Sequence, residues 1–565
     1  MARDGLSAND PKRTLCDPLI VACLPEGGFW RRPMARPWCR AAALATLIFT
    51  TGSSVVAQQL DVPRSTVPSA MPRIGTIDQR YQAYNIEMVE VTGGKFWKPY
   101  SSLSSSVQRK SGAEGGDTPV GMDSNLFEYR PPINLSSRRL RVLAAALSPT
   151  YLRVSGTWAN STYLESSDEH LTQPPEGFSH LLTQEQWNGV VEFSRAVSAP
   201  IVTSFATSSG TRDPGGIWTS HLGLRVLDYT RLLGGTIAAA EFMNEPTLAV
   251  LGGAPKGYDA EAYGKDFRVF HAFARDKAPE MLILGPGSVG ETIATDAHGS
   301  IGFIMTRDML RAGGYDVDAF SYHHYGATSQ RCTGTGVSPT KAQSALSEDW
   351  LARTDETLTF YRGLRDEFAA GKPLWVTETA ESACGGNPWA STFLDTFRYL
   401  DQLGRLAKGG VQVVMHNTLA ASDYALLDDH TYAPRPNYWA ALLWRRLMGT
   451  TVLDSGIPIG PGLHVYAHCM RDTPGGVTLL VINTSQNESK SLVIPVEGQR
   501  YTLSSAKLAD QAVRLNGIDL QLGVDDTFPP LPWNNSASGT TDFAPATITF
   551  IAVPAANNTA CHATE

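Results

Sequence analysis

The chain has 565 residues and a net charge of −8; 42% of its residues are hydrophobic and 18% are charged. This balance supports a large buried core and excludes a disordered or fibrous chain. There is no long run of basic residues, so nucleic acid is not expected as a partner. The length allows one large barrel with a smaller module, or roughly two to four domains of ordinary size.

The N-terminal region carries the features of an export signal. From Met34 the chain reads as a short basic segment, an apolar stretch and a Val55-x-Ala57 ending, which is the pattern of a secretory signal peptide. We therefore expect a secreted or periplasmic protein with its signal at about 34–57 and with no membrane span after cleavage, because the stretch is too short. A buried N-terminal helix is the alternative. Residues 1–33 are an upstream segment if translation starts at Met34.

Beyond residue 80, short apolar or β-branched runs alternate with amphipathic stretches of helical length. The expected strands are 84–91, 151–156, 200–206, 238–243, 281–285, 318–325, 374–377 and 411–416. The expected helices include 136–147, 185–197, 223–233, 266–276, 355–370 and 391–407, the last with an apolar stripe. This alternation predicts an α/β fold, a (β/α)8 TIM barrel over residues 84–448. A doubly wound open sheet is the competing architecture.

The pattern changes near residue 450. Short alternating strands follow, separated by turns rich in Gly, Pro, Asn and Asp, and they predict a β-sandwich over 449–565. We expect the N-terminal segment 58–83 to be able to add a strand to this sandwich. Residues 92–135 form a long Gly/Ser-rich insertion after the first strand, and loops of this length are uncommon unless they are functional or disordered.

Two glutamates follow or end expected strands of the barrel. Glu245, in Asn244-Glu245-Pro246, follows the fourth strand, and Glu378 ends the seventh. Strands four and seven face one another across a barrel mouth, where active sites lie. Two carboxyl groups are what glycoside cleavage needs, one as the acid and one as the nucleophile or base. An ion pair with arginine is the alternative for Glu378. Glu241 and Glu381 lie nearby, and we expect structural roles for them.

The sixth expected strand ends in Tyr322-His323-His324-Tyr325. Since neighbouring side chains on a strand point to opposite faces, His323 and Tyr325 can face the mouth together, where they can contact substrate. No HExxH motif is present, and we expect no metal. The segment 285–290 fits GxGxxG after a strand, but no strand follows at the distance that dinucleotide binding requires. The sequence predicts no cofactor.

The chain resembles glycoside hydrolase family 79, the heparanase and β-glucuronidase family. The segments that carry the resemblance are EFMNEP (241–246), LWVTETAESACGGNP (374–388), VVMHNTLAASDYALLD (413–428), LSPTYLRVSGT (147–157) and HVYAHC (464–469). They extend over most of the chain beyond residue 80. A single-chain member of the bacterial type is expected, because no internal segment comparable to the one removed from mammalian heparanase follows 162–170.

The resemblance also implies roles for individual residues. Glu245 would be the general acid/base and Glu378 the nucleophile of a retaining mechanism, which requires carboxyl groups about 5–5.5 Å apart. Tyr325 would hold Glu378. Asn244 would bond the 2-hydroxyl of the sugar, and Glu87 would bind other hydroxyls.

A uronate carboxylate would be received by Tyr424 and by the backbone N–H groups of Cys384 and Gly385. Such donors bind an anion without a counter-charge. The expected substrate is therefore a β-glucuronide or an oligosaccharide that contains uronic acid.

Four cysteines lie beyond the expected signal, and their spacing alone leaves three pairings open. The family joins the positions of Cys469 and Cys561. Cys384 replaces the first glycine of the family's loop, and a bond to Cys332 would tie the loops after strands six and seven together.

We expect a β-glucuronidase that acts on chain ends. The chain is acidic, it has no basic cluster for a sulfated polymer, and the insertion at 92–135 can close one side of the sugar subsite. The main alternative is a heparanase-like endo-β-glucuronidase acting on heparan-sulfate-type chains. Two others are a glycosidase for neutral sugars that uses the same glutamates and a carbohydrate-binding protein without catalysis.

Overall fold

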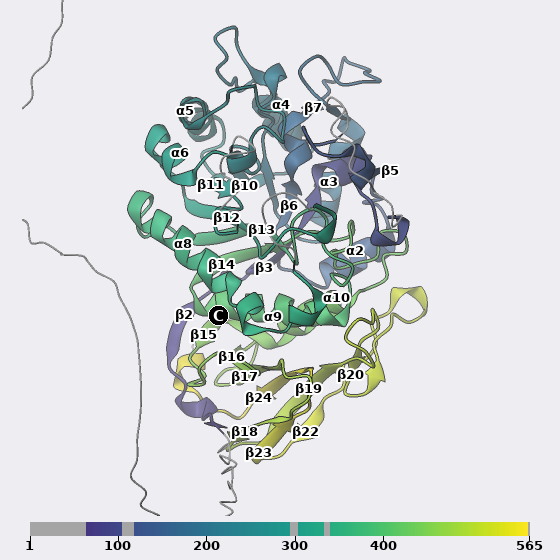
Figure 1. Ribbon diagram of the computed structural model, residues 1–565, viewed down its shortest axis with the longest axis vertical. Coiled ribbons are helices and arrows are strands. Elements are labelled where there is room, and N and C mark those ends of the chain that lie inside the picture. The colour runs from purple at the N-terminus through teal and green to yellow at the C-terminus, as the bar shows by residue number, and fades with distance from the viewer. Residues whose placement is uncertain (1–63, 104–117, 294–302, 333–339, 563–565) are drawn as a thin grey trace, which may run out of the picture. The chain divides into compact units, whose positions relative to one another are not determined.

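The computed structural model describes residues 64–103, 118–293, 303–332 and 340–562 (Figure 1). The expected signal peptide at 34–57 lies outside these ranges, so its cleavage stays a prediction. Within the described ranges, no helix combines the length and the apolar character that a membrane crossing requires.

Eight parallel strands close into a barrel in the order β10-β11-β12-β13-β14-β3-β6-β9. They are β3 (Gln82–Glu87), β6 (Leu152–Ser155), β9 (Ile201–Ser204), β10 (Ile237–Glu241), β11 (Leu282–Ser288), β12 (Ala319–Tyr325), β13 (Leu374–Ala380) and β14 (Val411–His416). The TIM barrel is thereby confirmed, and the open sheet was the wrong alternative. The segment 285–290 begins inside β11, so it forms barrel wall and not a phosphate-binding turn.

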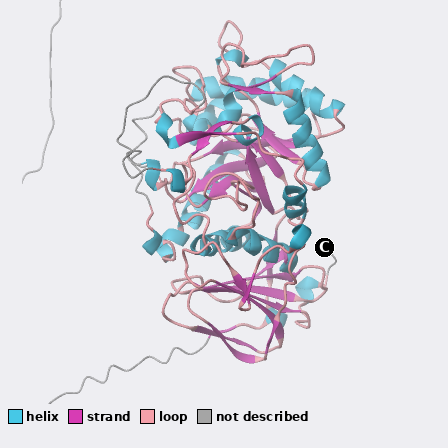
Figure 2. Ribbon diagram, turned by 90° about the vertical axis from the view of Figure 1, so that its right-hand side faces the viewer, coloured by secondary structure: helices cyan, strands magenta, loops and turns pink. Residues whose placement is uncertain are grey.

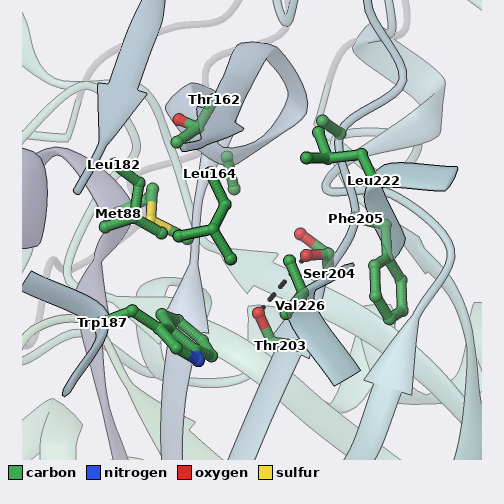
Figure 3. A pocket seen from close by; sticks show the side chains of 12 residues that line it. Met88, Thr162, Leu164, Leu182, Trp187, Thr203, Ser204, Phe205, Leu222 and Val226 are labelled. Atoms are coloured by element: carbon green, nitrogen blue, oxygen red, sulfur yellow. Dashed lines mark hydrogen bonds between the residues drawn. The ribbon is translucent and has the colours of Figure 1, made fainter. Parts of the chain in front are cut away.

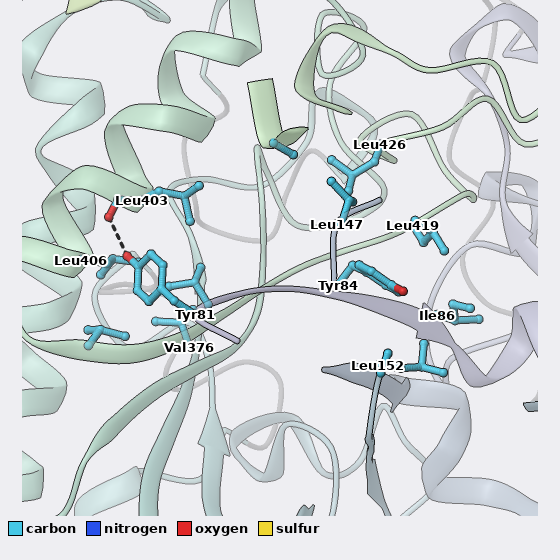
Figure 4. Close-up of a cluster of buried hydrophobic side chains, with 14 of the residues drawn as sticks. Tyr81, Tyr84, Ile86, Leu147, Leu152, Val376, Leu403, Leu406, Leu419 and Leu426 are labelled. Carbon is cyan, nitrogen blue, oxygen red and sulfur yellow. Dashed lines mark hydrogen bonds between the residues drawn. The ribbon is translucent and has the colours of Figure 1, made fainter. Parts of the chain in front are cut away.

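Helices surround the barrel strands (Figure 2). They are α1 (Met88–Thr92), α2 (Arg138–Ala145), α3 (Gln184–Ala196), α4 (His221–Leu232), α5 (Ala260–Lys277), α6 (Thr306–Gly313), α7 (Glu348–Leu351), α8 (Arg353–Phe368), α9 (Phe393–Lys408) and α10 (Pro436–Leu447). The expected strand at 84–91 was too long, because the chain turns into α1 directly after Glu87. Figure 4 shows the packing beside β3, where the hydroxyl of Tyr81 donates to the carbonyl of Leu403 on α9 at 2.6 Å.

The inside of the barrel is apolar at one level and polar at the next. The apolar cluster contains Ala83, Tyr151, Val202, Ala239, Leu284, Ala319, Trp375, Val413 and Met415. Because side chains on a strand alternate between faces, the next inward positions lie two residues further on. They hold Arg153 after Tyr151, Glu241 after Ala239, and Ser321 after Ala319, all buried. Buried polar groups must find partners, so this level predicts a hydrogen-bonded network beneath the barrel mouth.

Two sheets form the sandwich beside the barrel. The large sheet has the order β2-β15-β16-β17-β24-β19-β20-β21, with β22 beside β19, and the small sheet is β1-β18-β23. Their strands are β1 (Arg64–Ser65), β2 (Arg73–Thr76), β15 (Met448–Leu453), β16 (Leu463–Met470), β17 (Val477–Asn483), β18 (Lys490–Ile494), β19 (Gly498–Ser504), β20 (Arg514–Leu515), β21 (Ile518–Asp519), β22 (Asn534–Ser536), β23 (Gly539–Phe543) and β24 (Thr547–Val553). Leu492 and Phe543 of the small sheet pack on Val465, Leu479 and Ile551 of the large one. The N-terminal strands β1 and β2 pair with β18 and β15.

The barrel and the sandwich share a polar contact through α9. Nearly every residue of this helix is buried, so it has no solvent face opposite its apolar stripe. Asp401 on α9 accepts hydrogen bonds from Tyr466 and His464 of β16, both at 2.5 Å. Arg405, one turn on, donates to Asp401 at 2.7 Å and to Glu348 of α7 at 2.7 Å. The polar face of α9 is therefore buried as well as its apolar face, and its charged side chains are paired with residues of β16 and α7.

The described parts of the insertion form a small antiparallel hairpin sheet, β4 (Gly94–Trp97) and β5 (Phe127–Arg130). It lies beside the loops that follow barrel strands. Arg331, after β12, donates to the carbonyl of Lys98 and forms an ion pair with Asp423, after β14, at 2.6 Å. The ring centre of Tyr100 lies 4.1 Å from its guanidinium. The described segment that follows β4 is therefore fixed to the rim of the barrel mouth.

Candidate active site

Glu245 and Glu378 meet across the barrel mouth with His323 between them. One carboxylate oxygen of each glutamate and one ring nitrogen of His323 lie within 4.8 Å of one another. The side chain of Glu245 is 15% exposed and that of Glu378 is 6% exposed, so both border the opening. The two carboxyl groups that the sequence predicts at strands four and seven are thus brought together at the barrel mouth.

Glu245 is held by an unusual backbone conformation. It lies after β10 with φ 46° and ψ 62°, in the left-handed region that non-glycine residues avoid. Asn160 supports the turn from the β6 side: its side chain accepts from the N–H of Asn244 at 2.9 Å and donates to the carbonyl of Asn244 at 2.8 Å. Strained backbone of this kind clusters at functional sites, where neighbours enforce it. Sequence reasoning missed Asn160.

Glu378 enters the site through an irregularity in β13. The register with β14 shifts between Val376 and Thr379, as in a β-bulge, and both Thr377 and Glu378 reach the interior. Tyr325 donates to Oε1 of Glu378 at 2.6 Å, as expected from the resemblance. On the other oxygen, Arg153 donates to Oε2 at 2.8 Å. Both oxygens of the carboxylate are therefore fixed by charge-assisted or short hydrogen bonds.

Arg153 is the main residue that sequence reasoning missed. Besides Glu378, it donates to Glu241 at 2.9 Å and to the side-chain oxygen of Asn244 at 2.8 Å, and it is 1% exposed. Glu241 also accepts from Ser321 at 2.7 Å and from Thr377 at 2.6 Å. A lone arginine inside the apolar run YLRVSG is a signal that could have identified it, because a buried guanidinium needs acidic partners. The structural role expected for Glu241 agrees with these contacts.

The charges around the glutamates shift their pKa values in different directions. Burial and the negative charge on Glu378 raise the pKa of Glu245, although its hydrogen bond to His323, 3.1 Å long, acts the other way. Burial would raise the pKa of Glu241, but Arg153 holds it well below the usual range. Burial would lower the pKa of His323, yet Glu378 and the hydrogen bonds to Glu241 and Glu245 raise it to about 9. The raised pKa makes Glu245 suited to keep a proton.

The same three side chains are close enough to ligate a metal ion, but their surroundings do not favour one. Nδ1 of His323 is hydrogen-bonded to Oε1 of Glu245 at 3.1 Å. On the other ring nitrogen, Nε2, a guanidinium nitrogen of Arg153 lies 3.2 Å away. A fixed positive charge therefore already occupies the space between the acidic groups. The next residue, His324, points into the helix layer and approaches Thr354 of α8 at 3.4 Å, as the alternation predicts.

A second polar group surrounds Asn417, directly after β14. Its Nδ2 lies 2.9 Å from Glu87, 3.1 Å from the hydroxyl of Tyr325 and 3.2 Å from that of Tyr424. Burial and the charge on Glu378 raise the pKa of Glu87 well above its usual range. In the part of the chain that the structure describes, Oε2 of Glu87 has no hydrogen-bond partner, and neither has Nδ2 of Asn244. Both atoms are buried beneath the barrel mouth.

The loop after β13 forms the wall next to Tyr424. Cys384, Gly385 and Gly386 have φ of 65°, 77° and 82°, so three residues in succession are left-handed. A side chain at Gly385 would collide with Trp97, since a Cβ there would lie 2.6 Å from the indole. Among the hydrogen bonds of the described residues, none uses the backbone N–H of Cys384 or Gly385. Successive N–H groups in such a conformation form a concavity for anions.

Both expected disulfides are present. Cys332 is bonded to Cys384, joining the loops after β12 and β13, and Cys469 is bonded to Cys561 in the sandwich. Glu381 has a structural role, because it accepts from the backbone and the side chain of Asn387, both at 2.9 Å.

An internal cavity of about 30 Å³ lies elsewhere, behind the barrel wall (Figure 3). Apolar side chains such as Met88, Leu164 and Trp187 line it, together with Thr203 and Ser204 of β9. Its volume is enough for one or two water molecules and too small for a sugar. The cavity therefore belongs to the packing between strands and helices and not to the active site.

Comparison with known proteins finds relatives that are named glycosidases. No family model matches the chain. Heparanase of Mus musculus is 29% identical over 72% of this chain and 84% of its own, and hyaluronoglucuronidase of Hirudo nipponia is 24% identical over 78% and 95%. Baicalin-beta-D-glucuronidase of Scutellaria baicalensis is 27% identical over 53% and 56%.

Among solved structures, a 4-O-alpha-L-rhamnosyl-beta-D-glucuronidase from Fusarium oxysporum shares the fold, with a TM-score of 0.57 and 13% identity over 87% of this chain and 99% of that one. The curated relatives are named glycosidases, and their similarity supports a place for the chain in the heparanase and β-glucuronidase family.

Proposed function

We propose that this enzyme is a retaining β-glucuronidase that removes glucuronic acid from chain ends. The observation that carries the proposal is the approach of Glu245 and Glu378 to within 4.8 Å across the barrel mouth. A gap of this size leaves no room for water between carboxylate and anomeric carbon, as an inverting mechanism would need. Double displacement is the mechanism that fits the gap.

In the first step Glu378 attacks the anomeric carbon while Glu245 gives its proton to the leaving oxygen. The glycosidic bond breaks and a glycosyl ester on Glu378 forms. In the second step Glu245, now ionised, takes a proton from water, whose oxygen displaces Glu378 and restores both carboxyl groups. Arg153 and Tyr325, bonded to the two oxygens of Glu378, stabilise the carboxylate each time it leaves.

The preference for a uronate is supported by the loop after β13. Its unused N–H groups at Cys384 and Gly385 and the hydroxyl of Tyr424 are neutral donors. They provide an anion site without a lysine or arginine, which suits an acidic protein. The names of the relatives mouse heparanase, leech hyaluronoglucuronidase and plant baicalin-beta-D-glucuronidase also support glucuronide chemistry. Asn244 and Glu87, which lie beside the two proposed catalytic glutamates, would bind the sugar hydroxyls.

Action on chain ends is supported by the insertion. The hairpin of β4 and β5 is fixed to the rim by Arg331, Tyr100 and Asp423, and Trp97 contacts Gly385 of the loop. A wall on this side of the sugar subsite would stop a polymer from passing through. Cleavage within a heparan-type chain is the second candidate, since several relatives are named heparanase.

The test is a panel of aryl β-glycosides that differ only at C5, carrying a carboxylate, a hydroxymethyl group or a hydrogen. We expect turnover of the glucuronide, release of the β-anomer first by NMR, and loss of turnover in Glu378→Gln and Glu245→Gln. The exposed Glu185→Gln on α3 is the control and keeps full activity. Equal rates on all three glycosides would contradict the uronate preference, and shortening of heparan sulfate without cleavage of the aryl glucuronide would favour the endo mode.

A further inference from the structure

Cys384 has a left-handed backbone conformation that its neighbours must stabilise. This residue is left-handed at φ 65°, and unlike Gly385 and Gly386 it carries a Cβ that disfavours this conformation. Its sulfur is bonded to Cys332, 52 residues earlier in the chain. The bond joins the rim loop after β12 to the loop after β13, in which the N–H groups of Cys384 and Gly385 have no partner among the described residues.

Backbone hydrogen bonds set the direction of the loop. Ala383 and the β12 loop bond as in a parallel bridge: Ser329 donates to the carbonyl of Ala383 at 2.9 Å, and Ala383 donates to Ala327 at 3.0 Å. In a trans peptide the C=O and the following N–H point in opposite directions. Since the carbonyl of Ala383 points to the β12 loop, the N–H of Cys384 points away from it.

Further along, the carbonyls of the loop are also occupied. Ser422 donates to the carbonyl of Gly385 at 3.1 Å, and Ser329 donates to that of Gly386 at 2.6 Å. Trp97 fills the space beside Gly385. The carbonyls therefore bond to the protein, while the N–H groups of Cys384 and Gly385 stay without partners among the described residues.

We propose that the Cys332–Cys384 disulfide is a specificity determinant that holds these N–H groups in position for the C5 carboxylate of the substrate. The inference rests on the proposed function. The two cysteines act by positioning the backbone and take no part in bond cleavage. A sugar with hydrogen at C5 makes no use of these donors, so the disulfide matters only for uronates.

The experiment measures kcat/KM on an aryl β-glucuronide and an aryl β-xyloside for wild type and Cys332→Ala. Loss of the bond lets Cys384 leave the left-handed region, and we expect the glucuronide-to-xyloside ratio to fall about 5- to 30-fold, mainly through KM. If the xyloside turns over too slowly, competitive inhibition by glucuronic acid and by xylose gives the ratio. In Cys332→Ala/Cys384→Gly, glycine adopts the conformation freely, and the ratio should recover in part.

The matched control is the second disulfide. Cys469→Ala/Cys561→Ala removes a bond in the sandwich and should lower the thermal midpoint with the ratio unchanged. An unchanged ratio in Cys332→Ala, or an equal loss on both substrates, would overturn the inference. A wild type without activity on the glucuronide would instead reject the proposed function.

Discussion

Replacing Tyr325 by phenylalanine removes one hydroxyl from the active site. That hydroxyl donates to Oε1 of Glu378 at 2.6 Å and lies 3.1 Å from Nδ2 of Asn417. The ring stays, so packing in the barrel mouth is kept. Asn417 retains Glu87 and Tyr424 as partners, and Glu378 retains Arg153 on its other oxygen. The substitution therefore isolates one hydrogen bond to the proposed nucleophile.

The size of the effect follows from the charge on the acceptor. Hydrogen bonds to charged groups contribute about 1.5–3 kcal/mol, roughly twice as much as neutral ones. If this energy is lost when Glu378 leaves the sugar in the second step, the rate falls by about 10- to 150-fold. We expect the loss in kcat more than in KM, because the hydroxyl contacts the nucleophile and not the sugar.

The assay is steady-state hydrolysis of an aryl β-glucuronide, with the burst of aryl alcohol showing which step has slowed. Tyr322→Phe is the matched control on the same strand. Its buried hydroxyl has no hydrogen-bond partner among the described residues, so its removal should leave activity intact and not lower stability. Wild-type kcat in a folded Tyr325→Phe enzyme would refute the reasoning.

Three further predictions concern charge and selectivity. His323→Phe removes a hydrogen bond that lowers the pKa of Glu245, so Glu245 should keep its proton to higher pH and the alkaline limb of kcat/KM should move upward; an unmoved limb would argue against Glu245 as the acid. Burial would lower the pKa of His464, but Asp401 raises it to about 9, so its stabilising effect is complete below about pH 6.5 and is lost as pH rises through 9. Urea unfolding between pH 6 and 10 should show this loss in the wild type and a flatter profile in His464→Asn. Tyr424→Phe should lower kcat/KM for the glucuronide by about 10- to 150-fold while sparing the xyloside, and equal effects on both would count against a uronate site.

The barrel could be predicted from the sequence because its signals are local. The strands are short apolar runs that alternate with amphipathic helices. Asn244-Glu245-Pro246 follows strand four, and Glu378 ends strand seven. That Glu245 and Glu378 meet across the barrel mouth followed from the topology alone. The boundary of the first strand was missed because 88–91 is as apolar as the strand itself, and only the Glu87–Glu90 hydrogen bond marks the turn into α1.

The supporting residues could not be predicted in the same way. Arg153 and Asn160 bind residues that belong to other strands or follow them. The hydrophobic pattern of the sequence does not show which acidic side chain or backbone group will lie next to each of them. The sequence predicts that the charged face of α9 is exposed to solvent. In the structure Tyr466 and His464 of the sandwich cover it. Asn417 belongs to a segment that the family resemblance already included, yet its central place between Glu87 and Tyr424 depends on the closed barrel.

The pairing of β1 and β2 with strands near the other end of the chain has a consequence for biosynthesis. Gly75 pairs with Val452, and Asn558 donates to the carbonyl of Pro68, 490 residues earlier. These early segments leave the ribosome before their partner strands are synthesised, because the whole barrel is translated in between. Completion of the sandwich is then a late event that joins both halves of the polypeptide. A cut near residue 448 would leave the C-terminal part of the sandwich without β1 and β2.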